Sequence, residues 1–130
     1  MKKYRRQPAK TMRAVPGVVP ASVSGSVAGS LTVLFNPSEA HVQNLLRLRR
    51  LCHVLVAVDN SQVADLRLHE RLRSEGIDLL SNLNKGGVAG AYNKGLDRLV
   101  EKGCQLLFIF DQDSVAPEDY FVQMRTLASP

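Results

Sequence analysis

Two aspartates separated by one residue follow a continuous apolar segment, and no other arrangement in the sequence is better suited to chemistry. Leu106–Phe110 contains only apolar residues, which is typical of a buried strand in a parallel sheet. Asp111 and Asp113 come directly after it. In open α/β sheets, ligands bind beyond the carboxyl ends of the strands, so both carboxylates are placed where a substrate or a metal ion would be held. The structural alternative is a turn that caps a helix beginning near Pro117.

Alternating strands and helices must position these aspartates. Apolar runs predict buried strands, and apolar residues three or four positions apart predict the helices between them. The expected strands are Val27–Phe35, His53–Val58, Ile77–Leu80 and Leu106–Phe110, and the expected helices are Glu39–Leu51, Asp65–Ser74, Val88–Leu99 and Pro117–Leu127. This order predicts an α/β fold with a mostly parallel sheet and helices on both faces.

Polar residues follow each predicted strand. Right-handed crossovers place the carboxyl ends of parallel strands at one edge of a sheet, so the residues at the four strand ends should converge there: Asn36, Asp59, Ser81 and Asp111. Asp59 could accept a hydrogen bond from a base or a ribose, and Phe35 offers a ring face for stacking. The edge therefore predicts a site for a nucleotide-bound substrate, whose diphosphate would complete a divalent metal site at the two aspartates.

A turn-forming segment that contains Asn84 and Gly86 precedes the third predicted helix. Backbone amides at a helix start favour an anionic group. The segment matches neither the G-x-G-x-x-G dinucleotide pattern nor the G-x-x-x-x-G-K phosphate loop. The helix that follows can approach either a ligand or the sheet closely, because it carries small residues at Ala89, Gly90, Ala91 and Gly95.

The composition indicates one domain with a basic tail. The chain has 130 residues and a formal net charge of +5, but six of its 17 basic residues precede the first acidic residue, Glu39. A nucleic-acid-binding face would need its bases on a folded surface, so no nucleic-acid partner is expected. We expect residues 1–25 to be a disordered basic tail, or one loosely attracted to an anionic membrane surface, and residues 26–130 to be the folded domain. No apolar run approaches the roughly 20 residues of a membrane-spanning helix.

Cysteines and histidines give no further site in the sequence. Cys52 and Cys104 lack metal-ligand spacing and are expected to be small buried hydrophobic residues in a reducing compartment. His41, His53 and His69 are scattered, so each is expected to be exposed, or buried with its hydrogen bonds satisfied.

Four short motifs occur in a defined order along the chain. They are Leu34-Phe35-Asn36-Pro37, Val58-Asp59-Asn60, the block Asn84-Lys85-Gly86 with Ala91-Tyr92-Asn93-Lys94-Gly95, and Asp111-Gln112-Asp113-Ser114. Together they resemble the nucleotide-sugar-binding half of the inverting family 2 glycosyltransferases, which have the GT-A fold, a Rossmann-like nucleotide-diphospho-sugar-binding domain. The resemblance covers about Val27–Met124, and the Asp-Gln-Asp-Ser form is most like the bacterial rhamnosyltransferase branch. Leu34-Phe35 departs from the family's Thr-Tyr, which removes two hydroxyl groups.

The resemblance implies roles for particular residues. Asp113 would bind a divalent metal, Mg²⁺ or Mn²⁺, on the donor diphosphate, and Asp111 would contact the metal or the ribose. Asp59 would read the pyrimidine ring. The remaining nucleotide-sugar-binding residues would be Phe35, Asn36, Asn84, Gly86 and Asn93.

The resemblance also implies partners and a location. The expected donor is dTDP-rhamnose, with a UDP-sugar as the alternative. The acceptor would be a saccharide or a lipid-linked hydroxyl in cell-surface polysaccharide synthesis. The protein would be cytoplasmic, with peripheral association at the inner face of the plasma membrane.

No catalytic residue is identified in this chain. The family's catalytic base and most acceptor contacts lie well downstream of the metal motif, whereas the sequence ends at Pro130, and Glu118 and Asp119 are too close to that motif. We therefore expect a truncated transferase that lacks its acceptor and catalytic-base part. One alternative is a non-catalytic donor-binding remnant. Another is a haloacid-dehalogenase-like phosphatase with Asp111 as nucleophile, although that motif normally opens its fold.

Overall fold

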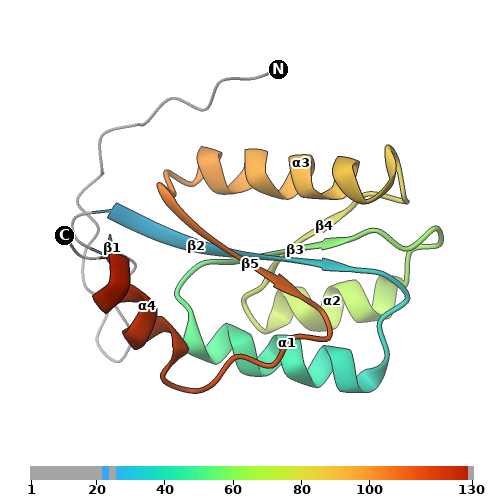
Figure 1. Ribbon diagram of the computed structural model, residues 1–130. Helices are drawn as coiled ribbons and strands as arrows, with labels where there is room; N and C mark the ends of the chain where they lie inside the picture. Colours follow the sequence, from blue (N-terminus) through green and yellow to red (C-terminus); the bar gives the residue numbers. More distant parts are fainter. Residues whose placement is uncertain (1–21, 24–25, 129–130) are drawn as a thin grey trace.

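The computed structural model describes residues 22–23 and 26–128 of the chain (Figure 1). Strands and helices alternate along these residues in the order β1 (Ser22–Val23), β2 (Ser26–Leu34), α1 (Glu39–Leu51), β3 (Leu55–Asp59), α2 (Leu66–Ser74), β4 (Asp78–Ser81), α3 (Gly87–Glu101), β5 (Leu106–Asp111) and α4 (Tyr120–Ala128). The predicted α/β fold is confirmed.

Four parallel strands form the main sheet in the order β4-β3-β2-β5, and the two-residue β1 pairs antiparallel with the start of β2. Leu34 pairs with Asp59 and Asp59 with Ser81, while on the other side of β2 Val33 pairs with Asp111. The four carboxyl ends therefore lie at one edge, as the sequence predicts. The strand order reverses at β2, because the chain passes from β2 to β3 and β4 and returns to the opposite side of β2 with β5.

Helices cover both faces of the sheet, with α3 on one face and α1 and α2 on the other (Figure 1). Apolar side chains fill both layers. Leu34, Leu45 and Leu72 belong to the core on the side of α1 and α2, and Leu31 and Leu99 to the core beneath α3. Because both faces are covered, all five residues of β3 are buried, and β2 buries Ser30 and Thr32 together with its apolar residues.

Small residues let α3 lie close to the sheet. A Cβ atom added at Gly95 would stand 2.3 Å from a Leu31 methyl carbon and 3.0 Å from one of Val58. A Cβ atom at Gly90 would stand 2.0 Å from the carbonyl oxygen of Lys85. Of the two possibilities that the sequence leaves open, the close approach of this helix is therefore to the sheet and to the preceding turn.

Several element boundaries differ from the sequence prediction. Strand β1, Ser22–Val23, lies within residues 1–25, for which the sequence predicts no structure. The other residues of that segment lie outside the described residues. Helix α4 begins at Tyr120, later than the predicted Pro117, because the Tyr120 amide donates to the Pro117 carbonyl at 3.0 Å and closes a turn before the helix. Strand β4 ends at Ser81, one residue beyond the predicted end at Leu80.

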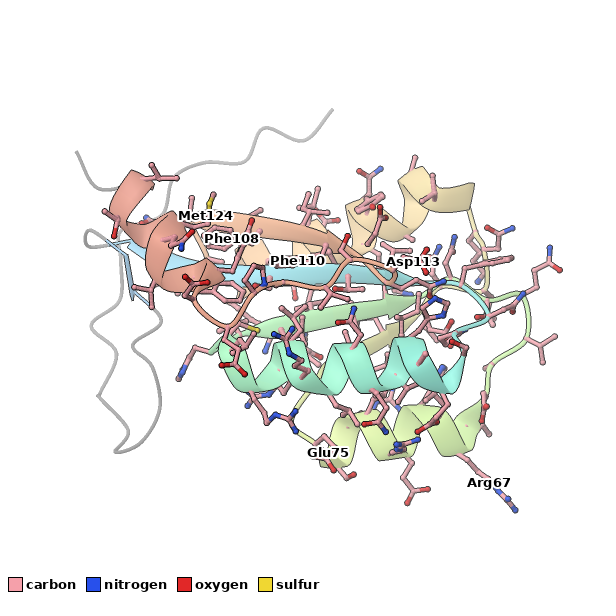
Figure 2. The ribbon with its side chains drawn as sticks, turned by 60° about the horizontal axis from the view of Figure 1, so that its bottom comes forward. Arg67, Glu75, Phe108, Phe110, Asp113 and Met124 are labelled. Atoms are coloured by element: carbon pink, nitrogen blue, oxygen red, sulfur yellow. The ribbon has the colours of Figure 1, made fainter. Side chains whose placement is uncertain are left out.

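Aromatic side chains join β5 to α4. Phe108 and Phe110 of β5 contact Tyr120 and Phe121 of α4, with ring centroids 5.3 to 6.3 Å apart. Figure 2 shows Phe108, Phe110 and Met124 gathered between these two elements. Both ends of the loop at residues 112–119 are therefore anchored in the core.

Both cysteines are buried and reduced, as the sequence predicts. Burial raises the pKa of the Cys52 thiol, and that of the Cys104 thiol, to about 11. Neither thiol is therefore activated as a nucleophile.

Candidate functional site

The candidate site lies at the carboxyl edge of the sheet, on both sides of β2. Phe35 and Asn36 follow β2, Asp59 ends β3, and Asp111 ends β5. Because β2 lies between β3 and β5, Phe35 stands between the two aspartates along this edge. Ligands of open α/β sheets bind where the strand order reverses, which here is at the carboxyl ends of β2 and β5. Phe35 is 47% exposed there, so its ring is accessible for stacking.

Gln112 links the ends of β2 and β5. Its side-chain oxygen accepts from the Phe35 amide at 3.0 Å, and its side-chain amide donates to the Phe35 carbonyl at 3.1 Å. These two bonds extend the pairing of the strands beyond the last ladder residues. Gln112 therefore fixes the aspartate loop relative to Phe35.

The aspartate loop begins as a turn in which the Ser114 amide donates to the Asp111 carbonyl at 3.0 Å. Helix α1 holds the rest of it. The Asn44 side-chain amide donates to the carbonyls of Gln112 and Ser114, and the Arg47 guanidinium donates to the carbonyl of Ala116. Backbone contacts thus define the path of the loop, while both aspartate side chains stay exposed.

His41 of α1 contacts the second aspartate. Its Nε2 lies 2.5 Å from Oδ1 of Asp113, whose side chain is 82% exposed. His41 is also part of the capping box that begins α1, in which Ser38 and His41 exchange hydrogen bonds. Figure 2 shows Asp113 beside the start of this helix. No spacing in the sequence connects these two residues, which are 72 positions apart.

Asp59 is buried and fully engaged. Its Oδ1 accepts from the Ser61 amide at 3.0 Å and the Ser61 hydroxyl at 2.6 Å, and its Oδ2 lies 2.6 Å from Nε2 of His69. The side chains of Asp59 and His69 are 2% and 3% exposed. This differs from the expected contact with a base, because Asp59 holds the segment after β3 and reaches no surface. The backbone amide of Asn36 donates to the Ser61 hydroxyl oxygen at 2.8 Å and so connects the end of β2 to this cluster.

Asparagines connect the end of β3 to the turn before α3. The Asn82 side chain donates to Asn60 at 2.8 Å and to the Lys85 carbonyl at 3.0 Å, and the Asn60 side chain donates to Asn84 at 3.1 Å. Asn60 and Asn82 are buried. Of these three, sequence reasoning selected only Asn84. Asn60 and Asn82 each directly follow a predicted strand-end residue, Asp59 and Ser81, and this position is the sequence feature that could have identified them.

Left-handed backbone shapes the turn before α3. Asn84 and Gly86 have φ values of 57° and 70°, a conformation that glycine and asparagine adopt most readily. Gly86 is the N-cap of α3 and supplies no side chain to its first amides. The binding of an anionic group at that helix start stays a prediction. Asn93 is exposed on α3, and among the described residues no hydrogen bond connects it to the edge.

Two exposed carboxylates at this edge fit a metal site that a substrate completes. Within residues 22–23 and 26–128, no three His, Cys, Asp or Glu side chains are grouped so that they could hold a metal ion by themselves. Asp111 and Asp113 supply two exposed carboxylates. Mg²⁺ is commonly held by one or two carboxylates together with substrate phosphates and water, so these residues fit a cation that arrives with a diphosphate.

Two further observations bear on function. Across the part of the chain that the structure describes, no helix combines the length and the apolar composition that crossing a membrane requires. Comparison of the chain with protein-family models, with curated proteins and with solved structures finds no match.

Proposed function

We propose that this protein binds a nucleoside-diphosphate sugar together with a divalent cation, as the donor-binding part of a glycosyltransferase of GT-A type. The observation that carries the proposal is the set of side chains that β2 and β5 bring together at their carboxyl ends. There an exposed aromatic ring, Phe35, stands beside a clamped loop with two exposed carboxylates, Asp111 and Asp113. A ring face and a divalent cation match the two ends of a nucleoside diphosphate, its base and its phosphates.

Each residue at this edge has a chemical task under the proposal. Phe35 stacks on the base, and Asp111 and Asp113 hold the cation, Mg²⁺ or Mn²⁺. When bound, such a cation neutralises charge on a departing diphosphate. Asp59 supports the site from below through Ser61 and Asn36. Gln112 keeps the carboxylates at a fixed offset from the ring. The favoured donor is dTDP-rhamnose, and the acceptor hydroxyl would come from a saccharide or a lipid-linked sugar.

Thermal denaturation with nucleotides tests the proposal. The chain is heated with dTDP, UDP or GDP, each with and without Mn²⁺ or Mg²⁺. A ligand at about a hundredfold excess over its Kd stabilises a protein by about 2.7 kcal/mol. For a domain of this size that corresponds to a rise in Tm of roughly 10 °C. We expect the rise only when a pyrimidine nucleotide and the metal are both present.

Matched acid variants identify the site. Asp113→Asn should abolish the metal-dependent rise in Tm, while Glu118→Gln, which removes an exposed acid later in the same loop, should leave it unchanged. If none of the nucleotides gives a metal-dependent rise in the wild-type chain, the proposal is wrong. If binding is found, release of dTDP from dTDP-rhamnose in the presence of a saccharide acceptor distinguishes a transferase from a module that only binds the donor.

A further inference from the structure

His41 stands between the start of α1 and the aspartate loop, and its two ring nitrogens have different partners. The Ser38 backbone amide donates to Nδ1 at 3.0 Å, and the Ser38 hydroxyl also lies 3.1 Å from Nδ1. A nitrogen that accepts an N–H carries no proton of its own, so the proton of the neutral ring is on Nε2. Nε2 therefore donates to Oδ1 of Asp113, 2.5 Å away.

The helix cap fixes this tautomer. His41 is the third residue of α1, and its amide donates to the Ser38 hydroxyl at 3.2 Å while its ring accepts from the Ser38 amide. Glutamate or glutamine usually fills this position of a capping box. Histidine serves the cap with Nδ1 and still presents a donor, Nε2, on the opposite side of the ring. The N-terminus of α1 is thus built to offer an N–H to Asp113.

The contact of His41 with Asp113 is one of three contacts that α1 makes, at regular spacing, with the loop after β5. His41, Asn44 and Arg47 are three residues apart, so they lie on one side of the helix, and all three bind the loop. Asn44 and Arg47 bind main-chain carbonyls and set the path of the loop. His41 alone in the series binds a side chain, that of Asp113. This carboxylate is otherwise exposed, and Oδ2 has no hydrogen-bond partner among the described residues.

We propose that His41 is a positioning residue for Asp113. It holds Oδ1 through Nε2–H and so leaves Oδ2 for the cation of a nucleoside diphosphate. The orientation of Asp113 follows from these contacts alone, whereas the role of Oδ2 rests on the proposed function. Partners that orient a metal-binding side chain typically change metal affinity by about 10- to 100-fold when they are removed.

Ring nitrogen shifts test the orientation without any ligand. In ¹⁵N-labelled protein in mildly alkaline buffer, His41 should show a protonated Nε2 and an unprotonated Nδ1, and Asp113→Ala should shift the Nε2 resonance. A ring protonated at Nδ1, or an Nε2 resonance that ignores Asp113→Ala, would overturn the inference whatever the ligand experiments give.

Mn²⁺ binding in the presence of dTDP tests the consequence. His41→Ala should weaken Mn²⁺ binding roughly tenfold or more. His41→Gln should recover most of it, because the amide oxygen can accept from the Ser38 amide while the amide nitrogen donates to Asp113. Ser38→Ala is the control for the cap: it removes the hydroxyl and lowers Tm, but it keeps the backbone N–H that binds Nδ1, so Mn²⁺ affinity should stay near that of the wild type.

The outcomes separate the two proposals. Equal Mn²⁺ affinity for His41→Ala and wild type would overturn the positioning role. If the wild-type chain bound no Mn²⁺ with dTDP while the ring shifts behaved as expected, the orientation of Asp113 by His41 would stand and the proposed function would be wrong.

Discussion

Replacing His69 by leucine should destabilise the protein strongly, because it leaves a buried carboxylate without one of its donors. Asp59 is 2% exposed, and Nε2 of His69 is the donor beside its Oδ2 at 2.6 Å. Ser61 would continue to serve Oδ1 only. Removing one partner of a buried pair typically costs about 3–5 kcal/mol. Because domains are stable by about 5–15 kcal/mol, His69→Leu would remove a large fraction of the total.

Urea unfolding measures this loss directly. For a small domain with an m value of about 1.5 kcal/mol/M, a loss of about 4 kcal/mol lowers the midpoint by roughly 2.5 M. His53→Leu is the matched control, since His53 has a buried Nδ1 with no hydrogen-bond partner in the described part of the chain. That variant should change the midpoint little.

A double-mutant cycle gives the sharpest test of the pair. Asp59→Leu combined with His69→Leu replaces two buried polar groups by apolar ones, so the double variant should be more stable than the sum of the single losses predicts. We expect a coupling of at least ~1.5 kcal/mol between the two positions. Additive losses, or a loss below about 1 kcal/mol for His69→Leu, would show that this pair does not hold the end of β3.

Three further predictions follow from other contacts. Burial alone would raise the pKa of Asp78, but hydrogen bonds from Arg98 and Lys102 hold this pKa below its usual value. The ionised Asp78 carboxylate therefore stabilises the fold above about pH 4, and this stabilisation is lost as the pH falls below about 4. Asp78→Asn should thus lower the urea midpoint at neutral pH and flatten its decline toward acid, and an unchanged pH profile would contradict this. The two buried cysteines, with thiol pKa values near 11, should react with iodoacetamide at pH 8 only after urea unfolds the chain. The hydroxyl of Thr32 is buried without a partner among the described residues, so Thr32→Val should raise stability by about 1–2 kcal/mol in the same urea assay, and a loss would show that the hydroxyl is satisfied.

The sequence predicted the sheet and its edge well because both depend on local patterns. The apolar run of β3 marks a strand that is buried on both faces. The equally apolar run of β5 was predicted to be buried too, but β5 pairs only with β2, and of its residues only Phe108 and Phe110 are buried. The alternation with helices favours parallel pairing. Helix α1 begins and ends at the predicted Glu39 and Leu51, where Ser38 caps it and Asn36-Pro37 stops the preceding strand. Convergence of the strand ends then follows from connection handedness alone.

Pairings across the edge could not be predicted in the same way. His41 reaches Asp113 because α1 lies against the loop after β5, which Asn44 and Arg47 also bind. His69 reaches Asp59 from α2, on the face of the sheet that α1 and α2 cover. The sequence separations of 72 and 10 residues carry no periodic signal. The histidines therefore looked scattered, although two of the three contact aspartates of the predicted site. Asn82 was missed for the same reason, since its partner Asn60 follows a different strand.

Asp59 and Asp113 lie in opposite environments, one buried and one exposed, and this difference indicates different roles. Asp59 is buried, and its two oxygens are engaged by three donors, so a ligand could bind this carboxylate only by displacing Ser61 or His69. Asp113 is 82% exposed, one of its oxygens is held by a histidine, and the loop beneath it is fixed through the main chain. A cation or a phosphate can approach Asp113 without disturbing the core. Under the proposed function, the ligand is therefore expected at the carboxyl ends of β2 and β5, and the end of β3 supports that site.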